Sequence, residues 1–88
     1  MQADRQKVER LLKTARGQLD GILKMVEENR YCMDISNQIM DTQAILHRVN
    51  REILQAHLQH CVRQSLETGE DSQQKIDELM ALFDKAVF

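Results

Sequence analysis

The 88-residue chain contains no proline and only three glycines, Gly17, Gly21 and Gly69. Proline and glycine are the residues that interrupt helices most strongly, so their scarcity leaves long stretches of backbone free to stay helical. Apolar residues recur at steps of three and four, and no stretch shows the alternation with period two that marks a strand. The sequence therefore predicts an all-α fold.

Three helices are expected within one domain covering residues 1–88, at about 4–29, 33–67 and 72–86. Asn29 is a suitable terminator for the first helix. Asp34 or Ser36 can serve the first turn of the second helix, and Ser72 is a good N-cap for the third. The apolar stripes are Val8, Leu12, Ala15, Leu19, Ile22 and Val26 in the first helix, and Ile35, Ile39, Leu46, Val49, Ile53 and Ala56 in the second, where Thr42 and Gln43 interrupt the stripe.

The second helix is too long for a small monomer to bury. At 1.5 Å per residue, a helix of some 33 residues is about 50 Å long. Its apolar spacing suits lengthwise packing against other long helices at a shallow crossing angle. We therefore expect an obligate oligomer, in which helices 1 and 2 of two chains form an antiparallel four-helix bundle.

The two cysteines, Cys32 and Cys61, are expected to be reduced thiols. The first ten residues lack the apolar segment of a signal peptide, and no run approaches the roughly 18 apolar residues of a membrane span. The chain is therefore expected to be cytoplasmic, with no membrane partner, and the cytosol keeps thiols reduced. Metal binding or redox chemistry is then a better expectation than a structural disulfide.

Charge is distributed unevenly, although the net charge is only −2. Residues 1–16 carry five basic and two acidic side chains, whereas residues 64–88 carry two basic and six acidic ones. This asymmetry predicts a basic face near the N-terminus and an acidic C-terminal element. The chain shows no set of nucleophile, base and orienting group beyond a Cys/His pair, and no glycine-rich phosphate loop, so an enzyme is not expected.

His57 and Cys61 are four residues apart, so on a helix they lie one turn apart on the same face and can bind one ion. Cys32 precedes His57 by 25 residues, which corresponds to about 37 Å along a straight helix. Cys32 can therefore join the other two only across subunits, where an antiparallel partner helix brings its start beside this helix's end. Twofold symmetry would give two such sites per dimer.

Two thiolates and one imidazole form a soft set of three ligands. Such a set favours Cu(I), because a structural Zn(II) site takes four ligands, but Zn(II) with a water as the fourth ligand stays an alternative. A second alternative is that the cysteines are simply small buried apolar side chains. His60 lies on the extrapolated core stripe and is interpreted as a polar residue at a helix seam, and the methionines are interpreted as core filling.

Three sequence blocks together resemble the CsoR family of bacterial transcriptional repressors: RGQLDGI at 16–22, YCMDI at 31–35 and HLQHCV at 57–62. The resemblance covers about residues 5–88. It implies an all-α dimer that pairs into a tetramer, binds operator DNA without ligand and releases it when an inducer binds. The family's copper sensors carry Cys, His and Cys where this chain has Cys32, His57 and Cys61, whereas the persulfide-sensing branch keeps the two cysteines and lacks the histidine.

The resemblance implies further residues around the site. Tyr31 matches a tyrosine that copper sensors place beside the ligands, where it would orient them, although a tyrosine packed at a helix junction is a plain alternative. An acidic partner on the last helix would be Asp77 or Glu78.

The resemblance also implies a DNA-binding surface of basic residues on helices 1 and 2, because no compact DNA-reading motif is present. The candidates are Arg10, Lys13, Arg16, Arg48 and Arg51. Many family members place arginines where this chain has Leu11 and Thr14, so its basic residues are displaced. Two alternatives stay open: a persulfide-sensing repressor that uses Cys32 and Cys61, and a small metal-binding bundle with no role on DNA.

Overall fold

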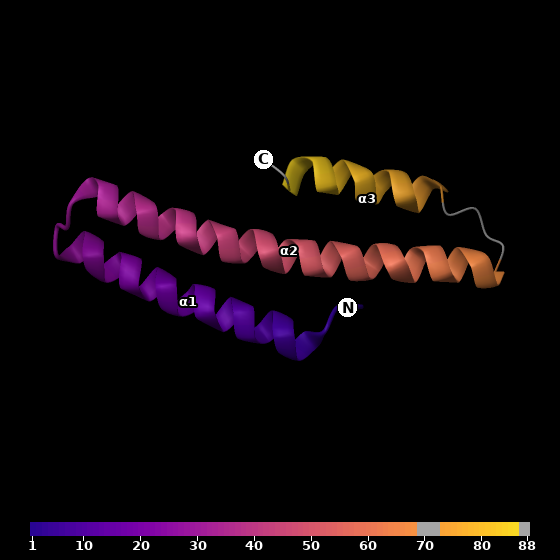
Figure 1. The fold of residues 1–88 in the computed structure, drawn as a ribbon, viewed down its shortest axis with the longest axis horizontal. Coiled ribbons are helices and arrows are strands. Elements are labelled where there is room, and N and C mark those ends of the chain that lie inside the picture. Colours follow the sequence, from indigo (N-terminus) through magenta and orange to yellow (C-terminus); the bar gives the residue numbers. More distant parts are fainter. Residues whose placement is uncertain (69–72, 87–88) are drawn as a thin grey trace.

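The computed structural model describes the backbone of residues 1–68 and 73–86 and the side chains of residues 1–64, 77–78, 80–82 and 84–85. It confirms the all-α fold, with α1 at Arg5–Glu27, α2 at Cys32–Thr68 and α3 at Gln73–Ala86 (Figure 1). The expected boundaries at 4–29, 33–67 and 72–86 differ from these by two residues or fewer. The expected cap at Ser72 lies outside the described residues.

Local side-chain chemistry sets both ends of α1. The Asp4 carboxylate accepts hydrogen bonds from the backbone N–H groups of Gln6 and Lys7, at 3.1 and 3.3 Å, and so satisfies donors that have no partner inside the helix. At the other end Asn29 has a φ of 54°, and the N–H of Arg30 donates to the carbonyl of Met25. This pair of features is a Schellman motif, with asparagine in the left-handed position that is most often taken by glycine.

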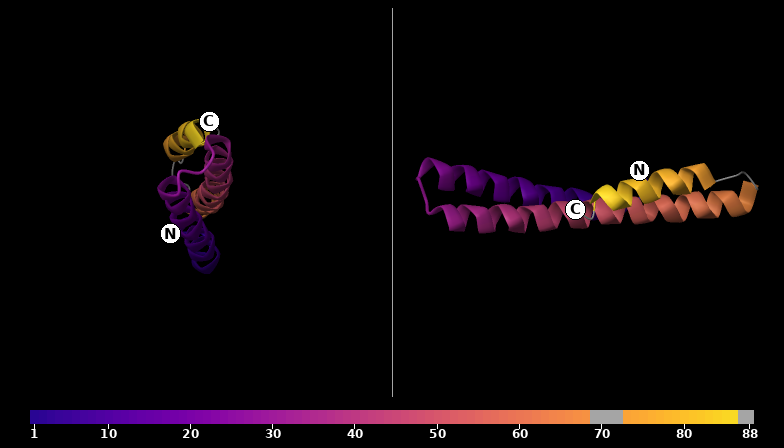
Figure 2. Two further views of the ribbon diagram at one scale, coloured as in Figure 1. Left: turned by 90° about the vertical axis from the view of Figure 1, so that its left-hand side faces the viewer. Right: turned by 90° about the horizontal axis from the view of Figure 1, so that it is seen from above.

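The three helices lie in a single layer. α1 runs antiparallel along the first part of α2 and α3 along the last part, below and above α2 in Figure 1, and the views in Figure 2 show how thin the assembly is. The chain spans 58 × 26 × 12 Å, and its shortest dimension is about the diameter of one helix. Its radius of gyration is 17.4 Å, against about 12 Å for a compact domain of this length. A single chain therefore leaves both broad sides of α2 uncovered.

The seam between α1 and α2 follows a seven-residue repeat. Val8, Ala15 and Ile22 are the buried residues of α1, and Thr42 and Val49 are buried on α2. A seven-residue spacing is the pattern by which two helices pack along their length. The sequence interpretation of Thr42 as an interruption of the core stripe was wrong, because Thr42 is only 3% exposed and belongs to the seam.

A second apolar stripe on each helix remains exposed. Its members are Leu12, Leu19 and Val26 on α1, and Ile39 and Leu46 on α2. Leu12, Leu19, Val26 and Leu46 each follow a buried seam residue by four positions, and Ile39 precedes Leu46 by seven. In an antiparallel hairpin both stripes therefore lie on the same side of the seam. A continuous exposed apolar surface of this kind marks a protein contact. None of the described helices is long and apolar enough to cross a membrane.

Candidate metal centre

His57 and Cys61 lie together on one face of α2. The Cys61 Sγ atom is 3.6 Å from His57 Nε2, across one helical turn. Cys61 is 4% exposed and packs with Leu54 and Leu58, whereas the His57 side chain is exposed. The chain thus presents one thiol and one imidazole nitrogen close enough to serve a single ion.

The pair borders a cavity of about 500 Å³, which is lined by residues from the N-terminal segment, α2 and α3. Its walls are formed by Met1, Gln2, Ile53, Leu54, His57, His60, Cys61, Gln64, Glu78 and Leu82. His60 is exposed and borders this cavity, so it does not lie in a closed seam of the single chain. Sequence reasoning missed His60, Gln64 and the N-terminal segment as neighbours of the site.

The cavity distinguishes between the two acidic candidates on α3. Glu78 lines the cavity together with His57 and Cys61, and Asp77 is not among the lining residues. Glu78 is therefore the acidic candidate that borders the same cavity as the His57–Cys61 pair.

Cys32 and Tyr31 lie at the opposite end of α2. Cys32 is the first residue of the helix and is exposed, and the Tyr31 side chain is 67% exposed. The Tyr31 carbonyl accepts the N–H groups of Asp34 and Ile35 and so starts the helix. About 37 Å of helix separates Cys32 from His57. Among the described residues no group of three His, Cys, Asp or Glu side chains could hold a metal ion, so one chain supplies only part of the expected site.

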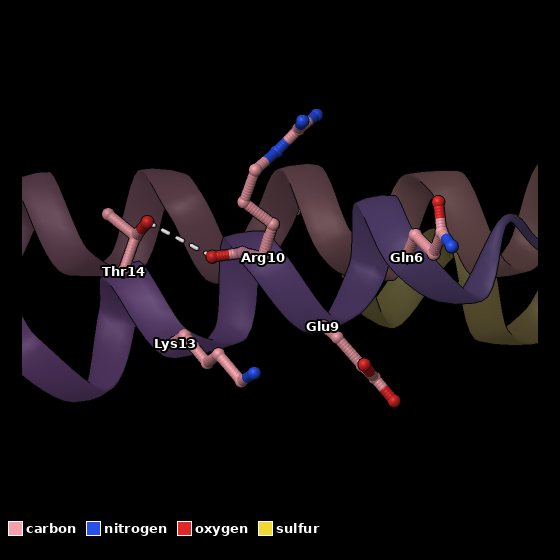
Figure 3. A pocket seen from close by; sticks show the side chains of 5 residues that line it. All are labelled: Gln6, Glu9, Arg10, Lys13 and Thr14. Carbon is pink, nitrogen blue, oxygen red and sulfur yellow. Dashed lines mark hydrogen bonds between the residues drawn. The ribbon is translucent and has the colours of Figure 1, made fainter.

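The five basic candidates for DNA contact are all exposed, and none forms an ion pair with another described residue. Arg10 and Lys13 border a shallow hollow on α1 together with Gln6, Glu9 and Thr14. Figure 3 shows that Arg10 extends to the opposite edge of the helix from Lys13 and Glu9. Each step of three residues turns the side-chain direction by about 60°, so Arg10, Lys13 and Arg16 cover a broad strip rather than a narrow line. Arg16, Arg48 and Arg51 lie outside this hollow.

Two polar contacts tie the basic helix α1 to α2. The Lys7 ammonium lies 2.8 Å from the Glu52 carboxylate, with both side chains about one-third exposed. The Thr42 hydroxyl donates to the amide oxygen of Gln18 at 2.8 Å, in the buried seam. Gln18 belongs to the GQLDGI block, but its partner could not be identified before the pairing of the helices was known.

The sequence matches the family model described as metal-sensitive transcriptional repressor over residues 4–85. The copper-sensing transcriptional repressor CsoR of Mycobacterium ulcerans is 45% identical over 69 residues, which are 78% of this chain and 58% of that protein. CsoR of Bacillus subtilis is 43% identical over 74 residues, which are 84% of this chain and 72% of that protein. This chain thus spans little more than half the length of the mycobacterial relative.

Two solved structures share the fold. The copper-sensing repressor CsoR with Cu(I) from Geobacillus thermodenitrificans NG80-2 is 37% identical, with a TM-score of 0.80 over 94% of this chain and 85% of that chain. The nickel-responsive transcriptional regulator InrS is 30% identical, with a TM-score of 0.82 over 98% of this chain and 96% of that chain.

Proposed function

Because this chain belongs to the metal-sensitive transcriptional repressors, a family of regulators rather than enzymes, we propose that it is a Cu(I)-responsive repressor. In this proposal the apoprotein binds operator DNA as a homo-oligomer, and Cu(I) bound by Cys32, His57 and Cys61 between two subunits lowers its affinity for DNA.

The observation that carries the proposal is the division of the ligands between the two ends of α2. His57 and Cys61 are 3.6 Å apart, and Cys32 lies about 37 Å away on the same unbroken helix. An antiparallel second chain is the arrangement that brings Cys32 to the pair without breaking the helix. The exposed stripe that contains Ile39 and Leu46 provides the apolar surface for that contact.

The donor set favours Cu(I) over nickel, the two metals named for the structural relatives. Two thiolates and one imidazole are soft donors, and soft thiolates favour Cu(I). CsoR from Geobacillus was solved with Cu(I), whereas InrS responds to nickel. Cu(I) would bridge the α2 helices of the two subunits, and Glu78 would orient His57 by accepting a hydrogen bond from its second ring nitrogen.

Exposed basic side chains on α1 and α2 support the proposed binding of DNA. Arg10, Lys13, Arg16, Arg48 and Arg51 carry charges that are not paired with other described residues. Side chains of this type bind phosphates and give an affinity that falls steeply with salt. A dimer of dimers repeats the set four times, which offsets the net charge of −2 on each chain.

The link between the metal and DNA would pass through the seam of the hairpin. Lys7 contacts Glu52 and Gln18 contacts Thr42, so α1 follows α2 when α2 shifts against its partner. With Cu(I) bound, Cys32 of one chain would be held to His57 and Cys61 of the other, and this would favour one spacing of the basic surfaces. Differential affinity for the two arrangements is what couples the two ligands.

The test measures binding of the protein to the promoter fragment of its own gene, with and without one Cu(I) per chain. Wild-type apoprotein should bind the fragment and release it with Cu(I), and His57→Ala should bind it but not release it. His47→Ala, an exposed histidine on the same helix, should behave as wild type. Retention of DNA by Cu(I)-loaded wild type would contradict the proposal, as would release by a persulfide donor that crosslinks Cys32 to Cys61 while Cu(I) has no effect.

A further inference from the structure

A third stripe of α2, here called the methionine stripe, is buried along only half of its length. Met33, Met40, His47, Leu54 and Cys61 follow one another at intervals of seven residues. Because seven residues are nearly two full turns, these side chains lie along one edge of α2, which drifts only slowly around the helix. In the C-terminal half Leu54 and Cys61 are buried, whereas in the N-terminal half Met33 is 56% exposed and Met40 54%. The single chain therefore leaves the N-terminal half of the stripe in solvent.

The helix α3 lies beside the buried half of the stripe. Glu78 and Leu82 line the cavity that also contains Cys61, and Lys85 lines a second hollow that contains Leu46. α3 therefore runs antiparallel to α2 from about the level of Cys61 to the level of Leu46 (Figure 1). Cys61 and Leu46 both belong to the subunit contact of the proposed function, so α3 lies at the edge of that contact.

Twofold symmetry places the exposed half of the stripe next to α3 of the other subunit. Two antiparallel α2 helices related by a twofold axis turn the same edge to the same side of their common plane. The pairing that brings Cys32 beside the partner's His57 and Cys61 sets residues 32–43 of one α2 level with about residues 46–61 of the other. This is the part of its own α2 along which α3 lies. Packed helices have their axes about 8–10 Å apart, so a third helix at the edge of the pair contacts both.

We propose that α3 of each subunit docks on the α2 helix of the partner and covers its Met33 and Met40. The docking face of α3 is the one that carries Leu82, which is 51% exposed and lies one turn from Glu78 on the cavity side. The occupant of this face is a second copy of the chain, because the subunit pairing brings two exposed apolar surfaces to the same level. Met33 directly follows Cys32, so the docked α3 also covers one side of the metal centre. The inference rests on the subunit pairing of the proposed function, and not on DNA binding.

The experiment measures the monomer–dimer equilibrium of the full-length apoprotein by sedimentation equilibrium. Leu82→Glu should raise the dimer Kd about 30-fold, because two half-exposed leucine side chains lose their burial against the partner. Met40→Glu should weaken the dimer by a similar factor. Met80→Glu is the matched control, since Met80 is 53% exposed on the same helix and lies about 160° around it from Leu82. It should associate as wild type does.

A charge exchange tests whether the two surfaces meet. Leu82→Glu combined with Met40→Lys should associate more tightly than Leu82→Glu alone, because opposite charges then face each other across the subunits. General damage to α3 would not be repaired by a substitution near the start of α2. The rescue therefore separates a contact with the partner from a change within one chain.

Equal Kd values for Leu82→Glu, Met80→Glu and wild type would overturn the inference. Equal weakening by Leu82→Glu and Met80→Glu would also overturn it, as would a double variant that associates no more tightly than Leu82→Glu. Failure of the proposed function gives a different result: the dimer would still depend on Leu82 and Met40, but wild type would not bind Cu(I) or would not release DNA with it.

Discussion

Leu46 is the position at which we expect a single substitution to weaken the proposed dimer most. Its side chain is 44% exposed in the single chain. An antiparallel pairing that brings Cys32 of one subunit beside His57 and Cys61 of the other has its twofold axis between residues 44 and 47, so Leu46 lies close to its own copy. Leu46→Glu should leave the isolated chain folded, because the position is exposed and glutamate and leucine have similar helix propensities. In the dimer, however, the substitution introduces two carboxylates at the same point.

The magnitude follows from two contributions. Full burial of a leucine side chain is worth about 1.5–3 kcal/mol, so burial of the 44% that is exposed is worth roughly 1 kcal/mol per copy and roughly 2 kcal/mol per dimer. Two like charges about 6 Å apart repel by about 3 kcal/mol at an effective dielectric constant of 20. Side-chain reorientation will relieve part of the repulsion, which leaves about 4 kcal/mol, or a dimer Kd raised about 1000-fold.

Sedimentation equilibrium of Leu46→Glu should therefore show dissociation at concentrations where wild type is associated, with a parallel loss of Cu(I) affinity in chelator competition. Ala44→Glu is the matched control, since Ala44 is exposed and lies about 160° around the helix from Leu46. It should assemble and bind Cu(I) as wild type does. If Leu46→Glu assembles and binds Cu(I) like Ala44→Glu, Leu46 is not at the subunit contact and the register is refuted.

Three further predictions concern the hairpin and its basic surface. Thr42→Val removes the hydrogen bond to Gln18, worth about 1 kcal/mol, but adds a buried methyl group of similar value. The free energy of unfolding measured with urea should therefore change by less than about 1 kcal/mol. A loss of several kcal/mol would show that the contact contributes far more than this. Asn29→Gly should keep or slightly raise the Tm and Asn29→Val should lower it, because φ is 54° there; equal values of Tm would contradict the left-handed cap. Lys13→Ala should reduce the slope of log affinity for operator DNA against log salt by about 0.9 if this side chain binds one phosphate, and an unchanged slope would remove it from the interface.

Much of the fold follows from short-range rules that act within the chain. The absence of proline and the spacing of apolar residues predict the helices, and the asparagine cap at Asn29 is found in the structure as a Schellman motif. The proximity of His57 and Cys61 follows from a spacing of four on a continuous helix, and the structure confirms it at 3.6 Å. These features depend on residues within about one helical turn of each other.

The remaining features depend on how the helices pair, which spacing within one helix does not determine. Thr42 looks like an interruption of its stripe until Gln18, 24 residues earlier, is placed opposite it. The stripe of α1 divides into a buried half with Ala15 and an exposed half with Leu19, and only the position of α2 decides which half is which. Likewise, the position of Glu78 beside the cavity depends on where α3 packs along α2.

The central claim is that one metal site is assembled from Cys32 of one subunit and His57 and Cys61 of another. It is tested most directly by mixing two variants, Cys32→Ser and Cys61→Ser, neither of which can form a complete site alone. When equal amounts of the two variants exchange subunits to equilibrium, about half of the dimers are heterodimers, and one of the two sites in each heterodimer keeps all three ligands. Cu(I) binding at wild-type affinity should therefore return at about one site in four. If the mixture binds no more Cu(I) than the separate variants do, the ligands do not come from two subunits and the account is contradicted.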